Sequence, residues 1–334
     1  MGVSPMPETM PDILVTENVA GEEMETLKRA FDVAFEPDLW RAPQKVRETI
    51  RDFRAIIVRN QTQVTAELLA AATKLEVVGR AGVGLDNVDV NAATEQGVVV
   101  AFTPEQNSIS VAELCLGLML SLARHIPSAD RSTRAGKWER QVFTGTELFG
   151  KTLGIVGLGR IGFLTALRAR AFGMHIIAHD NFISPDSAMV SECGAKLVSL
   201  DELLSRSDVV SVHVPHTPQT SGMFNAERFA QMKPGALFIN TSRGEVVNEE
   251  DLIIALREKK LAGAALDVRA TEPPAASPLN DMDNVILTPH IAAFTREGQK
   301  RVVSSICRDV AAVLRGEAAK YYVNFPRPKR GTGL

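Results

Sequence analysis

Two series of short apolar runs, separated by stretches with apolar residues at helical spacing, follow one another along the chain. The first series predicts strands at residues 13–16, 55–58, 76–79 and 98–101. The second series predicts strands at residues 152–157, 175–179, 209–213, 236–240, 264–268 and 285–288. Strands that alternate with helices in this way form parallel sheets, so the pattern predicts an α/β protein with two βα domains.

Three further segments have patterns of their own. Residues 108–126 are apolar nearly all round and predict a helix that is buried on most sides. We interpret this helix as part of a core rather than as a membrane span, since Glu113 and Ser121 interrupt it. Residues 296–314 have the spacing of an amphipathic helix, and the YYVNFP run that follows predicts an extended segment.

Composition narrows the class of function. Lys and Arg number 37 against 40 Asp and Glu, a net charge of −3, with no long run of one sign. We therefore expect no nucleic-acid partner and no membrane partner, and a small diffusible molecule instead. Cys115, Cys193 and Cys307 lie far apart, which favours reduced core thiols and neither a disulfide nor a metal site. The first twelve residues lack the features of a secretory signal, so a cytoplasmic protein is expected.

A glycine-rich turn lies directly between a predicted strand and a predicted helix, with glycines at Gly157, Gly159 and Gly162. The first glycine permits a tight turn, the second lets backbone N–H groups approach a pyrophosphate, and the third allows close packing of helix on strand. Asp180 ends the next predicted strand, 23 residues after the first glycine, where an acidic residue receives the adenosine ribose in dinucleotide sites. A carboxylate there repels a 2′-phosphate, so the pattern predicts NAD rather than NADP.

Three side chains that follow strands of the second series have the chemistry that reduction of a 2-keto acid needs. Arg243 supplies a planar guanidinium that can bind carboxylate and carbonyl oxygens. His290 can donate a proton to the carbonyl oxygen near neutral pH. Glu272 can accept a hydrogen bond from the imidazolium and so favour its protonated form. Ligands bind at the carboxyl ends of parallel strands, so we expect the three to share one site.

Six blocks of sequence have a characteristic order and spacing: GRAGVGLDNVD at 79–89, SVAELCLGLML at 110–120, GKTLGIVGLGRIG at 150–162, INTSRGEVVNEEDL at 239–252, GAALDV at 263–268 and LTPHIAA at 287–293. Together they resemble the D-isomer-specific 2-hydroxyacid dehydrogenases over nearly the whole chain. The resemblance implies two Rossmann-like or flavodoxin-like βα domains with a catalytic cleft between them. It also implies a discontinuous substrate domain, residues 1–105 plus 292–334, into which an NAD-binding Rossmann domain at residues 106–291 is inserted.

By motif match, the resemblance assigns roles to individual residues. Arg243 would bind the substrate, His290 would act as acid and base, and Glu272 would pair with His290. Backbone of Val83 and Gly84 would help to hold the substrate carboxylate. The residues expected to contact NAD are Gly157, Gly159, Arg160, Ile161 and Gly162 at the pyrophosphate, Asp180 at the ribose, and Pro215, Thr241 and Asp267 on the nicotinamide side.

Two positions depart from the pattern of this family. Arg269 stands where an aromatic or aliphatic residue is common, and Phe294 stands where a small residue often follows the histidine motif. Both departures bear on the size and charge of the substrate or on the packing of loops.

The choice of substrate depends on two further arginines. Arg59 and Arg80 end two strands of the first series, and a second anionic group on the substrate would be their target. The GRAGVGLDNVD block also resembles phosphoglycerate dehydrogenases more than the reductases of the family. A dianionic acid resembling 3-phosphoglycerate is therefore the first expectation, and glyoxylate or hydroxypyruvate reduction is the alternative. A hypothesis from another class is a dinucleotide-sensing binding protein, like the corepressors that are related to this family.

The resemblance also bears on assembly, motion and control. Together with the apolar helix at 108–126, it implies a homodimer. Closure of the domains, with hinges near residues 103–107 and 291–296, is expected to exclude water from the reaction. No regulatory domain is recognised after residue 325, so feedback control by an end product is not expected.

Overall fold

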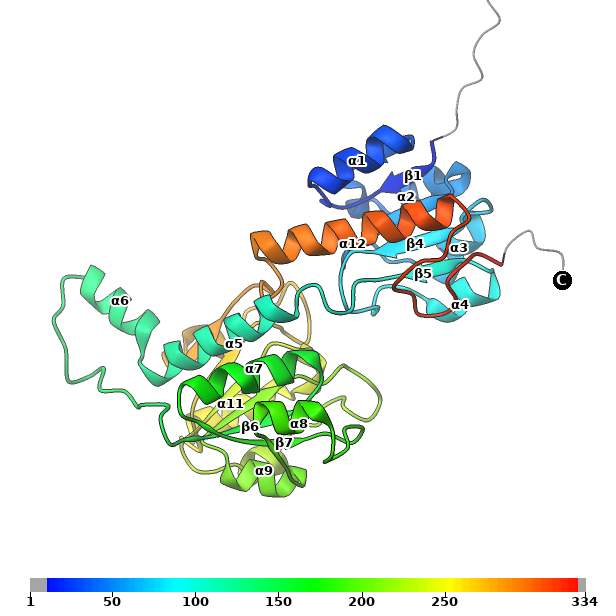
Figure 1. Ribbon diagram of the computed structural model, residues 1–334. Coiled ribbons are helices and arrows are strands. Elements are labelled where there is room, and N and C mark those ends of the chain that lie inside the picture. Colours follow the sequence, from blue (N-terminus) through cyan, green and yellow to red (C-terminus); the bar gives the residue numbers. More distant parts are fainter. Residues whose placement is uncertain (1–10, 330–334) are drawn as a thin grey trace, which may run out of the picture. The chain divides into compact units, whose positions relative to one another are not determined.

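The computed structural model describes residues 11–329, and the chain divides into two units, each built on its own parallel sheet (Figure 1). The first unit combines the chain up to Asn107 with the chain from Thr295 onward, and the second unit is Ser108–Phe294. The expected division into a substrate domain, residues 1–105 plus 292–334, and an NAD-binding domain, residues 106–291, stays a prediction. The predicted α/β class, with two parallel-sheet domains, is confirmed.

The sheet of the first unit has five strands in the order β2-β1-β3-β4-β5, which is the flavodoxin-like arrangement. The strands are β1 (Ile13–Val15), β2 (Val33–Phe35), β3 (Ala55–Val58), β4 (Val77–Arg80) and β5 (Val99–Ala101). The helical elements of this unit are α1 (Glu22–Ala30), η1 (Leu39–Arg41), α2 (Pro43–Thr49), η2 (Ile50–Asp52), α3 (Ala66–Ala71), α4 (Val90–Glu95) and α12 (Arg296–Leu314).

Both faces of this sheet are buried, because successive strand residues point to opposite sides. In β1, Ile13 and Val15 pack in one core with α1 and α12, whereas Leu14 packs in a second core under α2 and α3. The predicted helix at residues 296–314 is therefore α12, which completes a core begun by the other end of the chain. A Cβ on Gly79 of β4 would lie 2.6 Å from Val310 Cγ2, so this glycine allows α12 to approach the sheet closely.

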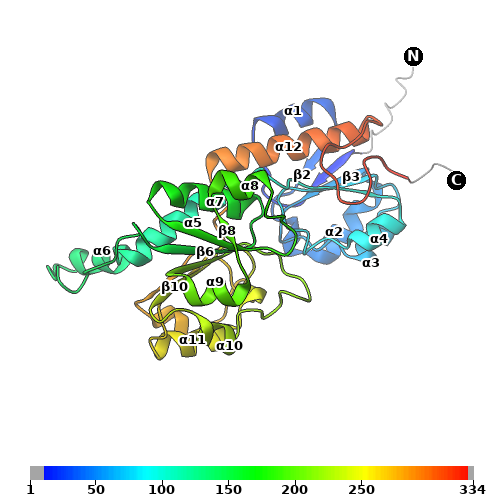
Figure 2. The ribbon, with the colours of Figure 1, turned by 60° about the horizontal axis from the view of Figure 1, so that its bottom comes forward.

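The sheet of the second unit has seven strands in the order β12-β11-β10-β9-β6-β7-β8 (Figure 2). The strands are β6 (Thr152–Val156), β7 (His175–His179), β8 (Lys196–Leu197), β9 (Val209–Val212), β10 (Ala236–Asn240), β11 (Leu261–Leu266) and β12 (Val285–Leu287). The strand order reverses between β6 and β9. In open α/β sheets this switch point is where ligands bind, outside the carboxyl ends of the strands.

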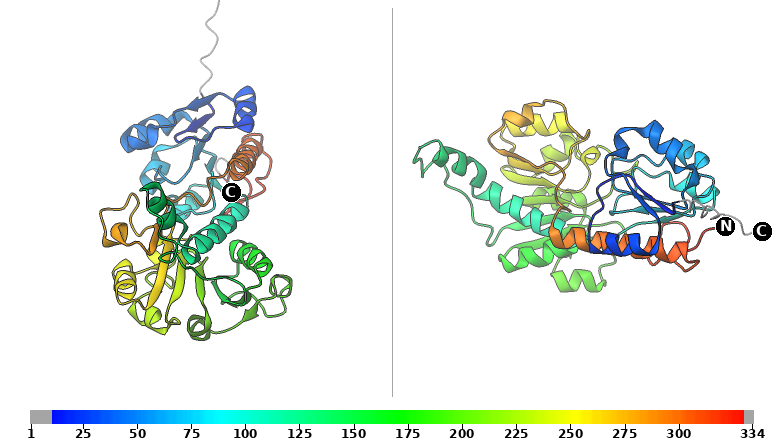
Figure 3. Two further views of the ribbon diagram at one scale, coloured as in Figure 1. Left: turned by 90° about the vertical axis from the view of Figure 1, so that its left-hand side faces the viewer. Right: turned by 90° about the horizontal axis from the view of Figure 1, so that it is seen from above.

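Helices cover both faces of the seven-stranded sheet (Figure 3). One core joins the sheet to α5 (Ser108–Ala123), α7 (Arg160–Ala171) and α8 (Ala188–Cys193). The other joins it to α9 (Leu200–Arg206), α10 (Ala226–Gln231) and α11 (Glu249–Arg257). The remaining helical elements are α6 (Ile126–Arg134), η3 (Gly244–Val246) and η4 (Pro278–Asp281).

Several elements differ from the sequence prediction. The strands β2 and β8 and the helix α6 were not predicted, and the helix expected over residues 108–126 ends at Ala123. His125 adopts a left-handed conformation with φ 54°, which breaks the helix before α6 begins. The strand expected at residues 264–268 begins earlier, as β11. In the YYVNFP run only Tyr322 forms a bridge, antiparallel to Ala101.

The apolar helix expected at residues 108–126 lies mostly within a core. Within residues 11–329, no single helix has both the length and the apolarity to cross a membrane. The pair α5 and α6 passes that test only in combination, and it is bent by 61° at the break. Ten of the sixteen residues of α5 are buried in the core of the second unit. The expected lack of a secretory signal concerns residues that lie largely outside the described part of the chain.

Candidate active site

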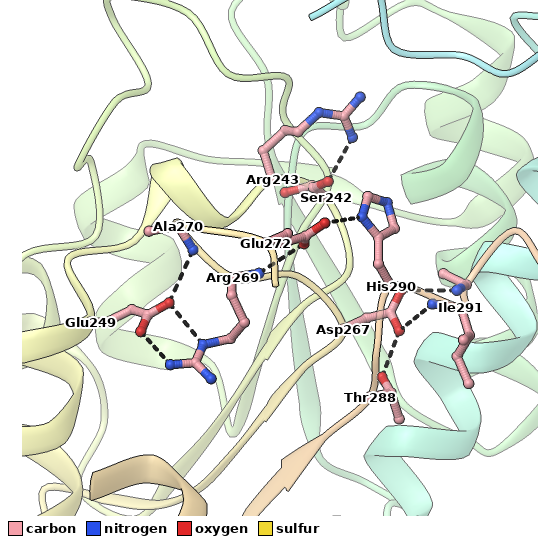
Figure 4. Close-up of polar contacts among 11 residues, drawn as sticks. Ser242, Arg243, Glu249, Asp267, Arg269, Ala270, Glu272, Thr288, His290 and Ile291 are labelled. Carbon is pink, nitrogen blue, oxygen red and sulfur yellow. Dashed lines mark hydrogen bonds and ion pairs between the residues drawn. The ribbon is translucent and has the colours of Figure 1, made fainter. Parts of the chain in front are cut away.

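Three neighbouring strands of the second unit bring the predicted chemical groups to one edge. The strands β10, β11 and β12 pair in parallel, and the loops after them carry Arg243, Glu272 and His290. Within this arrangement His290 Nδ1 lies 2.7 Å from Glu272 Oε2 (Figure 4). An ionised carboxylate can only accept, so Nδ1 carries the hydrogen and Nε2 is the nitrogen left for other chemistry. Both side chains stay partly open to solvent, with 38% and 33% of their surfaces exposed.

The backbone holds His290 in an uncommon conformation. Its φ is 54°, in the left-handed region that non-glycine residues seldom adopt. Its N–H donates to Asp267 O at 2.8 Å, which ties the histidine to the end of the neighbouring strand. Strain of this kind is maintained where the surrounding structure fixes the chain, and it concentrates at functional sites.

Asp267 fixes the segment that carries the histidine. Its side chain is 1% exposed, and its Oδ1 accepts hydrogen bonds from Thr288 Oγ1 at 2.6 Å and from the N–H of Ile291 at 2.9 Å. Its Oδ2 accepts from the N–H of Ala292 at 2.9 Å. The Asp267 carboxylate thus binds residues on both sides of His290 in the chain. The contact with nicotinamide expected for Asp267 stays a prediction.

The environment of Glu272 keeps its carboxylate charged. Burial by itself raises the pKa of Glu272, but the hydrogen bond and the charge of His290 outweigh burial. The N–H of Arg269, which donates to Glu272 Oε1 at 3.1 Å, and the charge of Arg243 act in the same direction, so the pKa lies below its ordinary value. The carboxylate is therefore held in its charged form beside the imidazole of His290.

Arg243 follows β10 in a loop that a buried asparagine organises. Asn240 Nδ2 donates to Arg243 O at 2.8 Å, and Asn240 Oδ1 accepts from the N–H and the hydroxyl of Ser242. Arg243 Nη1 donates to Ser242 O at 2.7 Å, and the side chain is half-buried. A guanidinium held in this way at a strand end can bind a carboxylate through two parallel hydrogen bonds.

The glycine-rich turn has the geometry that a dinucleotide requires. Gly157 has φ 93°, and a Cβ on Gly162 would lie 2.1 Å from Gly157 O, so neither position accepts a side chain without strain. A Cβ on Gly159, in contrast, would meet no described atom within 4 Å. Because α7 begins at Arg160, the first-turn N–H groups of Arg160 and Ile161 have no partner within the helix and are available to an anion.

Three further residues were expected at the NAD site. Asp180 Oδ2 accepts from the N–H of Leu158 at 2.8 Å, and Oδ1 accepts from the N–H of Phe182, so its carboxylate stands beside the glycine-rich turn. The Thr241 hydroxyl is buried at the end of β10 without a hydrogen-bond partner among the described residues. Pro215 is exposed after β9. An open glycine, unpaired helix N–H groups and an unsatisfied hydroxyl at the sheet's switch point are what a dinucleotide site needs.

The remaining predicted residues lie in the first unit, at the carboxyl ends of β3 and β4. Arg59 Nη2 donates to Gln299 Oε1 at 2.5 Å and Nη1 donates to Asn18 O at 3.2 Å. Burial lowers the pKa of Arg59, although Glu17 opposes this shift. Arg80 folds back over its own loop, since a Cβ on Gly82 would lie 1.4 Å from Arg80 Nη1. Val83 and Gly84 follow in the same loop and are half-buried.

The structure also contains two arrangements that the sequence did not predict. Glu249 and Arg269 form a buried ion pair next to Glu272. A chain of hydrogen bonds runs from Cys115 Sγ to Ser211 Oγ at 3.0 Å and on to His213 Nε2 at 2.9 Å. Burial lowers the pKa of His213 to about 4 and raises the pKa of Cys115 to about 11. Nothing in the sequence pairs Glu249 with Arg269 or Cys115 with Ser211, because the two partners come from different elements.

The two residues that depart from the family pattern have contrasting surroundings. Arg269 is buried, with 8% of its side chain exposed, whereas Phe294 is exposed.

Among residues 11–329, no three His, Cys, Asp or Glu side chains gather as metal ligands do.

Comparison with known proteins identifies the family. The model of the "D-isomer specific 2-hydroxyacid dehydrogenase, NAD binding domain" matches residues 116–292. A D-3-phosphoglycerate dehydrogenase of Synechocystis sp. is 44% identical over 318 residues, which is 95% of this chain and 57% of that protein. The chain therefore spans less than three fifths of the length of that relative.

Solved structures give the same result. A glyoxylate reductase from Paecilomyes thermophila superimposes with a TM-score of 0.84 at 31% identity, covering 95% of this chain and 99% of that chain. A D-lactate dehydrogenase from Aquifex aeolicus, complexed with NAD and lactic acid, superimposes with a TM-score of 0.82 at 30% identity, covering 94% and 100%. The family model and these relatives, together with the site geometry, show that the chain belongs to the D-isomer specific 2-hydroxyacid dehydrogenases, with an NAD-binding domain within its second unit.

Proposed function

We propose that the protein is an NAD-dependent oxidoreductase that interconverts a D-2-hydroxy acid and its 2-keto acid. The observation that carries the proposal is the 2.7 Å contact of His290 Nδ1 with Glu272 Oε2, at the strand edge that also presents Arg243. A proton donor, a group that favours its protonated form and a carboxylate-binding cation are the parts that reduction of a 2-keto acid requires. Membership of a family of dehydrogenases supports the same conclusion.

The roles of the three side chains follow from their contacts. Glu272 accepts from His290 Nδ1, so the transferable proton is held at Nε2. In keto-acid reduction this proton passes to the keto oxygen, and in the reverse direction Nε2 accepts it from the hydroxyl. Bound NADH supplies the hydride that goes to the keto carbon. Arg243 binds the substrate carboxylate and orients the carbonyl.

The proposed NAD site occupies the switch point of the seven-stranded sheet. The N–H groups of Arg160 and Ile161 would hold the pyrophosphate over Gly159, where no described side chain intervenes. Asp180 would accept hydrogen bonds from the adenosine ribose. The residues proposed to complete the site are Gly157, Gly162, Pro215, Thr241 and Asp267.

For the substrate, we propose an acid with a second anionic group, as in 3-phosphoglycerate. Arg59 and Arg80 end neighbouring strands of the first unit, and Val83 and Gly84 follow on the same loop. Two guanidinium groups at one sheet edge suit a phosphate better than a neutral hydroxyl. The curated relatives named D-3-phosphoglycerate dehydrogenase support this choice.

A second candidate is reduction of glyoxylate or hydroxypyruvate. The similarity to a glyoxylate reductase over 95% of this chain favours it. Such substrates carry one carboxylate, so they would need Arg243 but neither Arg59 nor Arg80. In the variants Arg59→Ala and Arg80→Ala, KM for a phosphorylated acid should rise at least tenfold while KM for glyoxylate stays within twofold. Equal effects on both substrates would favour the second candidate.

The test of the proposed activity is loss of NADH absorbance with a panel of phosphorylated, short and branched 2-keto acids. Turnover of one acid is expected, and His290→Ala should abolish it while NADH still binds. Lys300→Ala, on an exposed part of α12, is the control and should leave turnover unchanged. NADH binding without turnover of any acid would contradict the proposal and favour a dinucleotide-sensing protein.

We also propose that the protein is a cytoplasmic homodimer. The helix α6 extends away from the seven-stranded sheet (Figure 1) and buries none of its residues. The segment after it exposes Trp138, Val142 and Phe149. Exposed apolar side chains on a segment that leaves the core of its own unit suit an interface with a second copy. Three buried thiols without disulfides suit a reducing compartment.

Light scattering on size-exclusion chromatography tests the assembly. Trp138→Asp combined with Val142→Asp should convert a dimer to a monomer. Ile254→Asp, which places the same charge on an exposed apolar position of α11, should leave the mass unchanged. A monomeric native protein would contradict the proposal.

A further inference from the structure

Arg269, one of the two residues that depart from the family pattern, is held by an ion pair with the partly buried Glu249. Arg269 Nε donates to Glu249 Oε1 at 2.9 Å, and Arg269 Nη2 donates to Glu249 Oε2 at 2.6 Å (Figure 4). This is the two-point geometry that a planar guanidinium and a carboxylate favour. Only 8% of the Arg269 side chain and 21% of the Glu249 side chain are exposed. The guanidinium is therefore directed at Glu249 and away from solvent.

The same two residues fix the loop that carries Glu272. Glu249 Oε1 also accepts from the N–H of Ala270 at 3.1 Å, and the N–H of Arg269 donates to Glu272 Oε1 at 3.1 Å. Glu249 thus anchors the loop to the first turn of α11, through one side chain and one backbone group. The position of this loop therefore fixes Glu272, whose other oxygen, Oε2, accepts a hydrogen bond from His290.

The loop that carries Arg243 lies against this anchor. A Cβ on Gly244 would lie 2.0 Å from the carbonyl carbon of Arg269 and 2.3 Å from the N–H nitrogen of Ala270. The backbone after Arg243 and the backbone at Arg269 are therefore in direct contact. A displacement of Arg269 would move both loops.

The charges of the pair require each other. Burial by itself raises the pKa of Glu249, but the hydrogen bond from Arg269, the N–H of Ala270 and the charge of Arg269 outweigh it, so the pKa is lowered. Removing one partner would leave a buried charge without compensation, which is far more costly than exchanging both partners. The loop would then rearrange so that the remaining charge reaches water.

From these contacts we infer that Arg269 and Glu249 are positioning residues, which hold the Glu272 carboxylate on His290 Nδ1 and steady the loop of Arg243. Neither residue needs to touch substrate for this role. The inference rests on the proposed dehydrogenase function. Arg269 would then affect the rate of the reaction although its side chain is buried.

The kinetic test uses Arg269→Ala, Arg269→Lys and Glu249→Gln in the full chain, with thermal melting as a check on folding. Arg269→Ala should lower kcat about tenfold to a hundredfold, leave the Kd of NADH within twofold, and move the alkaline limb of the pH–rate profile to lower pH, as Glu272→Gln does. Arg269→Lys should recover part of the loss. The double variant Arg269→Ala/Glu272→Gln should be no slower than Glu272→Gln alone, because both changes remove one interaction.

A matched control separates catalysis from stability. Arg54 forms a half-buried ion pair with Glu76 at 2.6 Å in the first unit, so Arg54→Ala removes a comparable pair far along the chain from the site. It should lower the melting temperature and leave the pH–rate profile unchanged. An unshifted profile in Arg269→Ala and in Glu249→Gln would overturn the inference.

A second readout does not depend on turnover. The ring-proton NMR signals of His290, identified by their loss in His290→Asn, report its titration directly. The charged groups that act on Glu272 are His290 and Arg243, and neither of them is substituted in these variants. The His290 titration should move to lower pH in Arg269→Ala and in Arg269→Lys by a smaller amount. If it does not move in either, the inference fails even if the protein is a dehydrogenase, and if it moves in a protein without turnover, only the proposed function fails.

Discussion

At the scale of single residues, the negative charge of Glu272 is what favours the protonated form of His290 in the proposed reaction. The pKa of Glu272 is lowered because His290 and its other partners outweigh the effect of burial, so the carboxylate stays ionised over the whole range of a pH–rate profile. In Glu272→Gln the amide no longer favours the imidazolium. We expect the rate of keto-acid reduction at neutral pH to fall roughly a hundredfold and its alkaline limb to move to lower pH by about one unit. Steady-state rates from pH 5 to 10 measure both effects, with the exposed Glu250→Gln as control. An unchanged limb would mean that Glu272 is only structural.

His213 is the residue through which we expect acid to act on stability. Burial lowers its pKa from 6.5 to about 4. Between these two pH values the histidine is protonated in the unfolded chain but neutral in the folded protein. The free energy of unfolding should therefore fall as the pH drops from about 6.5 to about 4, by on the order of 2–3 kcal/mol from this residue. Urea unfolding at several pH values should show that His213→Gln loses this part of the dependence. His175→Gln, at an exposed position of β7, should keep the native slope.

The sequence could place the residues of the proposed site at one sheet edge, but it could not identify the residues that support them. Arg243 and His290 were predictable because each directly follows an apolar run, and the carboxyl ends of parallel strands share one edge. The pair of Arg269 with Glu249 was not, since it joins residues 20 positions apart on two different elements. Its geometry depends on the path of a loop that has no periodic pattern. Asp267 was predictable as a site residue, yet its three hydrogen bonds to the His290 segment became visible only in the structure.

At the scale of elements, the turn between β6 and α7 gives a prediction that separates folding from cofactor binding. A Cβ in Gly162→Ala would lie 2.1 Å from a backbone oxygen, so we expect a loss of about 1–3 kcal/mol in the free energy of unfolding and weaker NADH binding. A Cβ in Gly159→Ala meets no described atom within 4 Å, so the melting temperature should hold while the Kd of NADH rises at least tenfold. Thermal melts and NADH fluorescence titrations measure the two effects. Native affinity in Gly159→Ala would place the pyrophosphate elsewhere.

The elements that the sequence failed to predict have little burial. The edge strand β2 is only half-buried, and β8 has two residues, so neither produces an apolar run that stands out from its surroundings. The helix α6 buries no residue, and its polar composition has no core-facing stripe. Central strands such as β3 and β9, which are buried along their whole length, were predictable to within a residue. The burial of side chains creates the apolar pattern in the sequence. Elements that are stabilised mainly by backbone pairing therefore have no such pattern.

At the scale of the whole molecule, the two units depend on the chain in different ways. The second unit is continuous in sequence, and it has a core on each face of its sheet. The first unit is complete only when the far end of the chain returns as α12. Side chains of α12 from Val302 to Leu314 supply a large part of the core on one face of the five-stranded sheet.

This difference predicts opposite outcomes for two fragments. A fragment of residues 108–294 should fold with a cooperative thermal transition and bind NADH, because it keeps both cores and the glycine-rich turn. A fragment of residues 1–107 should fail to fold, since without α12 the apolar face formed by Ile13, Ile57 and Val77 would be open to water. Adding a separate peptide of residues 295–329 should restore helical circular dichroism and a thermal transition to the second fragment. A cooperative transition in residues 1–107 alone would show that the five strands and their opposite core suffice, and that α12 adds stability without being required for the fold.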